Sequence, residues 1–142
     1  MKGFTLLEIL LSVAAITIIS GMSIPVYQSF QVKDALDIAV VSTAQSLRRA
    51  QNLSFASDGD SSWGTKIASG SITVFKGASF DSREASFDEV FDLPTSISPS
   101  GVGEIVFNKL TGEPQTVGAI VFTSSINETA TLTINGKGMV DY

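Results

Sequence analysis

The sequence predicts an α+β fold in which one long N-terminal helix packs on a small antiparallel β domain. Three observations lead to this prediction. Residues 9–32 carry no charged side chain, residues 32–50 repeat apolar side chains at helical spacing, and most glycines and prolines follow residue 58. The first two patterns are typical of helices, and the third is typical of short strands joined by turns. With 142 residues the chain has room for one domain of ordinary size.

The composition narrows the classes of function. The net charge is −5, and residues 33–142 alone carry 8 basic and 13 acidic side chains, again −5. Phosphate binding needs clustered lysines and arginines, so nucleic acid is not an expected partner. The chain has no cysteine and no histidine, which excludes disulfides and thiolate sites and removes the commonest general base. We therefore predict a protein that is not an enzyme, with no catalytic residues, no metal and no cofactor.

The uncharged run Ile9–Val32 is long enough to cross a membrane. As a helix its 24 residues would extend about 36 Å, at about 1.5 Å for each residue, which exceeds the ~30 Å hydrocarbon core of a bilayer. Lys2 places the N-terminus on the cytoplasmic side and the rest of the chain outside. The sequence therefore predicts a single-pass membrane protein.

Polar and helix-breaking residues interrupt this run without preventing a membrane helix. Gly21 and Pro25 are tolerated in membrane helices, although Pro25 is expected to kink the helix or unwind it locally. Four hydroxyl side chains can bond back to carbonyl groups of the helix itself: Ser12, Thr17, Ser20 and Ser23.

A secretory signal peptide is the alternative explanation of the same stretch. It would use Lys2 as its basic region, Leu6–Ile19 as its apolar core and a cleavage site within residues 20–23. Glu8 falls where that core should be apolar, and the helical pattern continues through the cleavage site. Both features favour a helix that remains in the mature protein.

The stretch Gly3-Phe4-Thr5-Leu6-Leu7-Glu8 resembles the processing site of type IV prepilins and of the pseudopilins of type II secretion. In those proteins a short basic leader precedes glycine, then phenylalanine, then a glutamate and an apolar run. The resemblance implies that residues 1–3 are a leader peptide. It also implies that a prepilin peptidase/N-methyltransferase cleaves between Gly3 and Phe4 and methylates the new amine of Phe4.

Glu8 is a carboxylate at the mouth of an apolar segment, where charged groups are rare and functional. Cleavage would leave a positive amine on Phe4, and Glu8 of the same chain, or of the next subunit as the resemblance implies, can pair with it. Such pairing offsets the several kcal/mol that each charge would cost alone in an apolar medium. The alternative is an interfacial residue that contacts lipid headgroups. Glu8 and Pro25 are the candidate assembly residues.

Beyond the apolar run the helix becomes amphipathic. We expect one continuous helix from Phe4 to about Phe55, with residues 4–32 as the transmembrane and assembly part and residues 33–56 continuing into the globular domain. The loop at 57–62 ends it, and its acidic D-x-D spacing is read as a solvated turn rather than a Ca²⁺ loop. The side chains expected to face the domain recur every three or four residues: Val32, Ala35, Leu36, Ala39, Val40, Thr43, Leu47 and Ala50.

Residues 57–142 are predicted to form the antiparallel β domain. The expected strands are Gly64–Ala68, Ser71–Phe75, Ser86–Leu93, Gly103–Asn108, Gly118–Thr123, Thr129–Asn135 and Met139–Asp141. We expect the stretch 93–101 to be a loop, and Asn135-Gly136 to form a tight hairpin with two positive φ angles. The acidic run 81–92 is expected to be a solvated strand whose apolar side chains face inward. Asn127-Glu128-Thr129 matches a glycosylation pattern but is expected to be only an exposed turn.

The order of these strands is similar to the globular domain of the minor H-type pseudopilins of type II secretion and of related minor pilins. The residues that carry this likeness are Trp63-Gly64, Phe75-Lys76-Gly77, Phe107, Gly112 and Ile134 leading to Gly138. Some DNA-binding minor pilins have arginines near the C-terminus, whereas residues 136–142 here contain one lysine and one aspartate. This departure argues against DNA binding.

These features together predict a pilin-like structural subunit of a type IV pilus-like or type II secretion filament. Its expected partners are the peptidase, other pilins or pseudopilins through the N-terminal helix, the inner-membrane assembly platform and membrane lipid. It would reside in the bacterial inner membrane and then in a periplasmic or surface filament. Two alternatives remain, namely a minor pilin that acts as a DNA-uptake receptor and a plain membrane-anchored extracytoplasmic domain.

Overall fold

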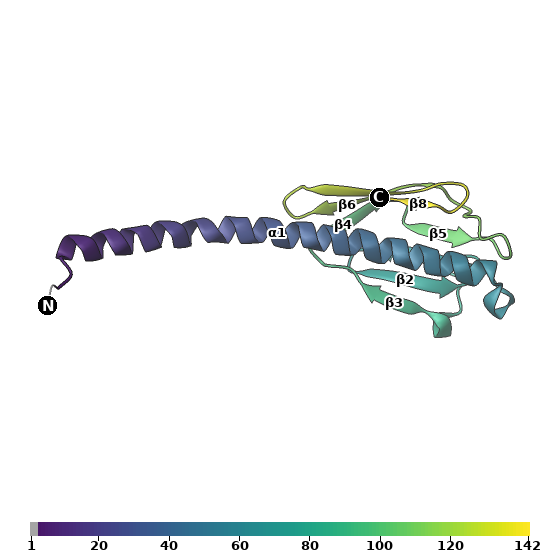
Figure 1. Cartoon of the computed structure of the whole chain (residues 1–142). Helices are drawn as coiled ribbons and strands as arrows, with labels where there is room; N and C mark the ends of the chain where they lie inside the picture. The colour runs from purple at the N-terminus through teal and green to yellow at the C-terminus, as the bar shows by residue number, and fades with distance from the viewer. Residues whose placement is uncertain (1–2) are drawn as a thin grey trace.

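The structure is a computed structural model that describes residues 3–142, apart from the side chains of residues 22–29. One helix, α1 (Leu6–Phe55), is followed by eight strands in the described chain. The first part of α1 projects away from the strands, and its second part lies along them (Figure 1). The predicted α+β class, a long helix packed on antiparallel sheets, is confirmed. Lys2 lies outside the described residues.

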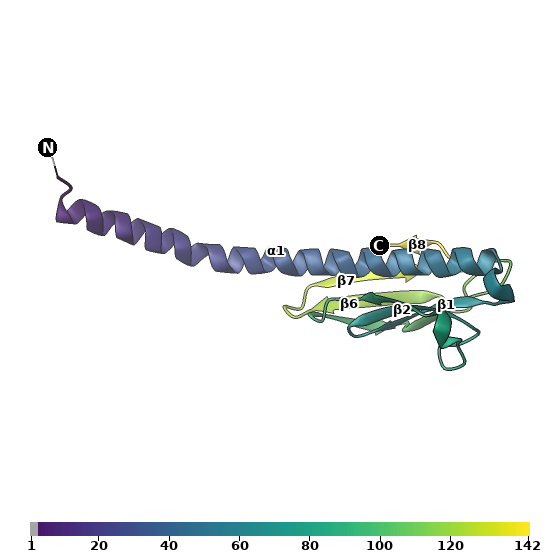
Figure 2. The same cartoon turned by 90° about the horizontal axis from the view of Figure 1, so that it is seen from below.

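Helix α1 has nearly the predicted extent. It begins two residues later than expected, because Thr5 is extended and caps it, and it ends at Phe55 as predicted. The helix continues through position 25 without a break, so the local unwinding expected there is not found. The helix axis curves only gently (Figure 2). The side chain of Pro25, one of the candidate assembly residues, lies outside the described residues.

The eight strands form two antiparallel four-stranded sheets. The first sheet has the order β3-β2-β1-β5 and the second has the order β4-β6-β7-β8. Two short 3-10 turns, Asp58–Asp60 and Ala85–Phe87, precede β1 and β3. The bounds are β1 (Trp63–Ala68), β2 (Ser71–Lys76), β3 (Glu89–Asp92), β4 (Ile97–Gly101), β5 (Glu104–Phe107), β6 (Gly118–Ser124), β7 (Thr129–Ile134) and β8 (Val140–Asp141).

Strand β4 was not predicted, and the expected loop over residues 93–101 is wrong for its second half. Ile97 is buried and begins the strand, and Pro99 pairs with Phe122 of β6. A proline has no backbone N–H, so it is normally excluded from central strands. It is tolerated here because β4 is the edge strand of its sheet.

The amphipathic half of α1 and both sheets share one hydrophobic core. Figure 2 shows β1 and β2 of the first sheet and β6 and β7 of the second on the same side of the helix. The helix contributes the face predicted from its periodicity, since Leu36, Leu47 and Ala50 are buried. The sheets contribute the large side chains Ile72, Val74, Ile105, Phe107, Ile97, Ile120, Phe122, Leu132 and Ile134. Burial of this apolar surface is the main stabilising term of the domain.

A buried hydroxyl joins the end of the helix to the first sheet. Ser54 accepts a hydrogen bond from the backbone N–H of Trp63 at 2.7 Å. Its Oγ also lies 3.1 Å from the carbonyl oxygen of Phe107 and 3.2 Å from that of Trp63. The hydroxyl therefore satisfies backbone groups of two strands at the point where α1 ends.

The acidic run 81–92 differs from the prediction. Only four of its residues form β3, and β3 is the other sheet's edge strand. Phe87, Val90 and Phe91 are exposed, and only the following Leu93 is buried. The predicted apolar inner face is therefore found only in part, at Leu93 and at Phe91, which lines a hollow against α1, because a short strand at an edge has little core to cover.

The turn between β7 and β8 also differs. It spans residues 135–139 rather than two residues, and positive φ is found at Gly138 (φ 78°) but not at Asn135 or Gly136. The side chain of Asn135 accepts hydrogen bonds from the N–H groups of Lys137 and Met139. This side-chain bonding replaces the tight hairpin that the Asn-Gly pair predicted.

Candidate assembly helix and processing segment

The first part of α1 is an apolar helix that projects away from both sheets (Figure 1). Its large side chains are exposed on every face: Leu6, Leu7, Ile9, Leu10, Leu11, Val13, Ile16, Ile18 and Ile19. A helix that is apolar all round is normally covered by lipid or by other helices. This exposed arm, defined here as residues 6–21, is therefore the first candidate for a functional surface.

The candidate processing residues lie at the free end of the arm. Gly3, Phe4 and Thr5 precede the helix, and Phe4 is 82% exposed. Apart from Gly3 itself and its two chain neighbours, no heavy atom of the described residues lies within 4 Å of the position that a Cβ on Gly3 would occupy. The Gly3–Phe4 bond is thus in an exposed, non-helical stretch, the conformation in which a protease can bind a chain.

Glu8 has a role that the sequence analysis missed. The side chain of Thr5 accepts a hydrogen bond from the N–H of Glu8 at 3.3 Å, and the Glu8 carboxylate accepts one from the N–H of Thr5 at 3.3 Å. This reciprocal pair is a capping box, and its T-x-x-E pattern was visible in the sequence. The capping box therefore holds the Glu8 carboxylate at the start of the helix, against the backbone N–H of Thr5, the residue that follows Phe4.

The hydroxyl groups within the apolar run behave partly as predicted. Ser12 donates to the carbonyl of Glu8 at 2.8 Å, and Thr17 donates to that of Val13 at 2.7 Å. Ser23 lies among the side chains outside the described residues. Each observed bond turns a polar side chain back onto its own helix, which leaves the arm apolar to its surroundings.

The predicted membrane segment Ile9–Val32 includes positions 22–29, whose side chains are outside the described residues. Over the part of the chain that is described, no helix combines the length and the apolar character needed to cross a membrane.

The second part of α1 carries an exposed stripe on the side away from the sheets. Its members recur at alternating four- and three-residue intervals, which is the heptad spacing of helix-packing surfaces. We name it the outer stripe: Asp34, Ile38, Val41, Gln45, Arg48, Asn52 and Phe55. Ile38, Val41 and Phe55 are 53%, 39% and 65% exposed, so the stripe combines apolar and charged groups.

Ion pairs engage most of the basic side chains of the domain. Of the eight lysines and arginines in residues 33–142, six pair with carboxylates, which leaves Lys33 and Arg48. The pairs are Arg49–Glu89, Lys66–Glu104, Lys76–Glu84, Arg83–Asp88, Lys109–Asp60 and Lys137–Glu113. The described surface therefore lacks the clustered free cations that phosphate binding needs.

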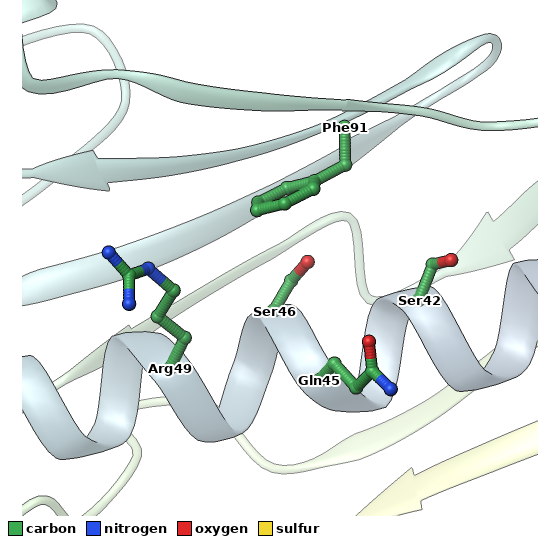
Figure 3. A pocket seen from close by; sticks show the side chains of 5 residues that line it. All are labelled: Ser42, Gln45, Ser46, Arg49 and Phe91. Carbon is green, nitrogen blue, oxygen red and sulfur yellow. The ribbon is translucent and has the colours of Figure 1, made fainter.

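A hollow of about 190 Å³ separates α1 from β3. Figure 3 shows the ring of Phe91 pointing from the strand toward the helix, opposite Ser46 and beside Arg49. A side-chain hydrogen bond from Arg49 and its charge lower the pKa of Glu89, while burial acts in the opposite direction. The hollow offers hydroxyls and one guanidinium that already has a carboxylate partner.

The remaining sequence candidates lie in turns. The carboxylate of Asp60 pairs with Lys109, whose hydrogen bond lowers the pKa of that carboxyl group. Within residues 3–142, as far as they are described, no group of three potential metal ligands occurs. Asn127 lies in the exposed turn between β6 and β7, as predicted, with φ 62°.

Comparisons of the chain with protein-family models, with curated proteins and with solved structures found no match in any of the three.

Proposed function

We propose that this protein is a structural subunit of a type IV pilus-like or type II secretion filament, processed after Gly3 and assembled through α1. In this proposal the exposed arm resides in the bacterial inner membrane before assembly and among the arms of neighbouring subunits afterwards. The β domain remains outside the cytoplasm.

The observation that carries the proposal is the exposed arm behind the Gly3–Glu8 motif. The helix extends well beyond the core of the domain and presents large aliphatic side chains in all directions. An apolar surface of this size on a water-soluble monomer would be unusual. Lipid would cover this surface while the protein is in the membrane, and the helices of neighbouring subunits would cover it in the filament. The motif at the end of the arm supplies the signal for the cleavage that precedes assembly.

Glu8 would serve two roles in succession. Before cleavage it caps the helix through the N–H of Thr5. After cleavage the N-methylated amine of Phe4 lies one residue away, and the same carboxylate can pair with it or with the amine of a neighbouring subunit. The second role needs the negative charge, whereas the first needs only a hydrogen-bond acceptor.

The direct test is mass spectrometry of the chain from bacterial membranes with and without prepilin peptidase. We expect a mature protein that begins with N-methyl-Phe4 only when the peptidase is present, and we expect Gly3→Leu to block this change. A chain that begins near Ser23, or that keeps Met1 in cells with the peptidase, would contradict the proposal.

Two conservative variants separate the roles of Glu8. Glu8→Gln keeps a side chain that can complete the capping box but removes the charge. Thr5→Ala removes the cap and keeps the charge. We expect Glu8→Gln and Glu8→Ala to insert into membranes but to fail in filament incorporation or methylation, while Thr5→Ala is still incorporated. Normal incorporation of Glu8→Gln would contradict the charge-pairing role.

The two alternatives predict different results. A plain anchored domain would be indifferent to Glu8→Ala. A DNA-uptake receptor would bind duplex DNA in a salt-dependent manner, and Lys137→Ala or the pair Arg48→Ala and Arg49→Ala would abolish that binding. The acidic balance and the ion-paired lysines and arginines support the filament subunit over the receptor.

A further inference from the structure

We propose that the turn between β6 and β7 is a lipid-contacting surface, on which the side chain of Ile126 enters the headgroup region of the bilayer that holds the exposed arm. The inference rests on the proposed function, which puts the arm in a membrane and the β domain outside it. It goes further because it assigns a lipid contact to the β domain itself.

The turn is the part of the β domain that extends furthest toward the exposed arm, as Figures 1 and 2 both show. A hollow of about 530 Å³ between helix and turn is lined by Lys33, Leu36, Asp37, Asn127, Glu128 and Thr129. Lys33 is the first charged residue after the uncharged run that ends at Val32. The turn therefore lies beside α1 at the point where the helix would leave the hydrocarbon core.

The tip of the turn presents one large apolar side chain among uncharged neighbours. Ile126 is 51% exposed, and Ser125 and Asn127 on either side of it are exposed as well. Two hydrogen bonds of 3.0 Å close the turn, from the N–H of Asn127 to the carbonyl of Ser124 and from the N–H of Glu128 to the Ser124 hydroxyl. An aliphatic side chain at such a tip is stabilised when it moves from water into the interfacial region of a bilayer.

The helix supplies a second apolar group and a cation near the turn. Phe30 is 63% exposed and precedes Asp37 by one heptad, so the two residues lie on nearly the same face of α1. Lys33 lies between them and has no ion-pair partner among the described residues, although Asp37 follows it by one helical turn. A lysine at the end of a membrane helix extends its ammonium group toward the lipid phosphates.

Carboxylates behind these groups limit how far the domain can sink. Asp34 and Asp37 follow Phe30 on the helix, and Glu128 lines the hollow behind the tip of the turn. Moving a carboxylate into hydrocarbon is costly, and anionic lipid repels it. The surface therefore fits shallow insertion of Ile126 and Phe30. Lipid is the expected occupant rather than a second copy, because this end of the domain faces the bilayer.

Quenching of a fluorescent probe by nitroxide lipids tests the contact, with the full chain in phosphatidylcholine vesicles. The chain has no native cysteine, so a single cysteine can be labelled at a chosen position. Ser125→Cys reports on the turn and Ile16→Cys on the arm. Leu110→Cys is the matched control, because Leu110 is exposed in a turn whose N–H bonds to Ser54, near the far end of α1.

We expect a nitroxide near the headgroup to quench the probe at position 125, and a nitroxide deep in the acyl chain to quench the probe at position 16. Neither lipid should quench the probe at position 110.

Substitution of Ile126 separates an apolar contact from mere proximity. In the chain labelled at position 125, Ile126→Asp should lower the quenching at least about twofold, because a carboxylate does not enter the interfacial region. Ile126→Leu should leave the quenching unchanged. Ile126 is exposed, so both variants should fold, and the emission of the buried Trp63 in the unlabelled variants checks this.

Three results would overturn the proposal: no quenching at position 125, equal quenching with Ile126→Asp, or protection of the probe that depends on the protein-to-lipid ratio, which would indicate a second copy. If the probe at position 16 is quenched in any of these cases, the lipid contact of the β domain fails while the membrane role of the arm stands. If that probe is not quenched either, the proposed function fails as well.

Discussion

The guanidinium group of Arg49 on α1 holds both carboxylate oxygens of Glu89 on β3. The two residues are 40 positions apart, and their pair ties the outermost strand of the first sheet to the helix. None of the four side chains of β3 is fully buried. The ion pair therefore fastens β3 to the helix, although the side chains of Arg49 and Glu89 are both partly exposed.

Glu89→Gln should lower the free energy of unfolding at neutral pH by about 0.5–1 kcal/mol, because a surface ion pair with good geometry is lost. The pKa of Glu89 is lowered in the folded protein. Its contribution is therefore present above the unfolded pKa of about 4.3, and it is lost as the pH falls through the lower folded value. Urea unfolding followed by fluorescence of Trp63, the single and buried tryptophan, measures the difference.

The control for that pair is Asp92→Asn, which removes an exposed carboxylate at the end of the same strand. We expect it to change stability by less than about 0.5 kcal/mol. If the deficit of Glu89→Gln persisted unchanged at pH values well below 4.3, charge pairing would not be its cause.

Ser54→Ala should destabilise the domain by about 1–3 kcal/mol, because the N–H of Trp63 would be buried without its acceptor. Ser42→Ala, at a half-buried position of the same helix, is the control and should have little effect. Urea midpoints of the two variants give the comparison. Equal midpoints would show that the Ser54 hydroxyl is replaceable, for instance by water.

Leu132→Ala should cost about 2–5 kcal/mol, since Leu132 is fully buried where β7 faces the core. Thr131 is its neighbour on the strand, and its side chain lies on the opposite, exposed face. Thr131→Ala should therefore change the free energy of unfolding by no more than about 0.5 kcal/mol. Similar losses for both variants would mean that both faces of β7 are covered.

The two glycines of the last turn should respond in opposite ways. Gly138 has φ 78°, and a Cβ there would lie 2.1 Å from Nε2 of Gln51, so Gly138→Ala should cost more than about 1 kcal/mol. Gly136 has open space and no positive φ, so Gly136→Ala should be neutral or stabilising by up to about 1 kcal/mol. Thermal unfolding of both variants measures the two changes in stability. A larger loss of stability for Gly136→Ala than for Gly138→Ala would contradict the observed turn and favour the tight hairpin that the sequence predicted.

The structure also changes how Glu8 is understood. From the sequence it was an isolated charge that needed a partner, and the structure assigns it a hydrogen-bonding partner at the helix start, Thr5. The T-x-x-E pattern of residues 5–8 is local, so the sequence alone was sufficient to predict this cap. The assembly role remains a prediction.

The sequence by itself determined the features that depend on neighbours along the chain. The buried face of α1 follows from the spacing of Leu36, Ala39 and Leu47, and the alternation along residues 129–134 follows from one polar and one apolar side chain in turn. Periodicity is a local property, because the helix and the strand each dictate which side chains share a face.

Tertiary structure alone decided the rest. Pro99 could be part of a strand only because its strand lies at a sheet edge, and Phe91 is exposed because β3 lies at another. Arg49 finds Glu89 only when the fold brings the helix and the strand together. Strand order and long-range pairing depend on which surfaces meet in the folded chain, and no local pattern carries that information.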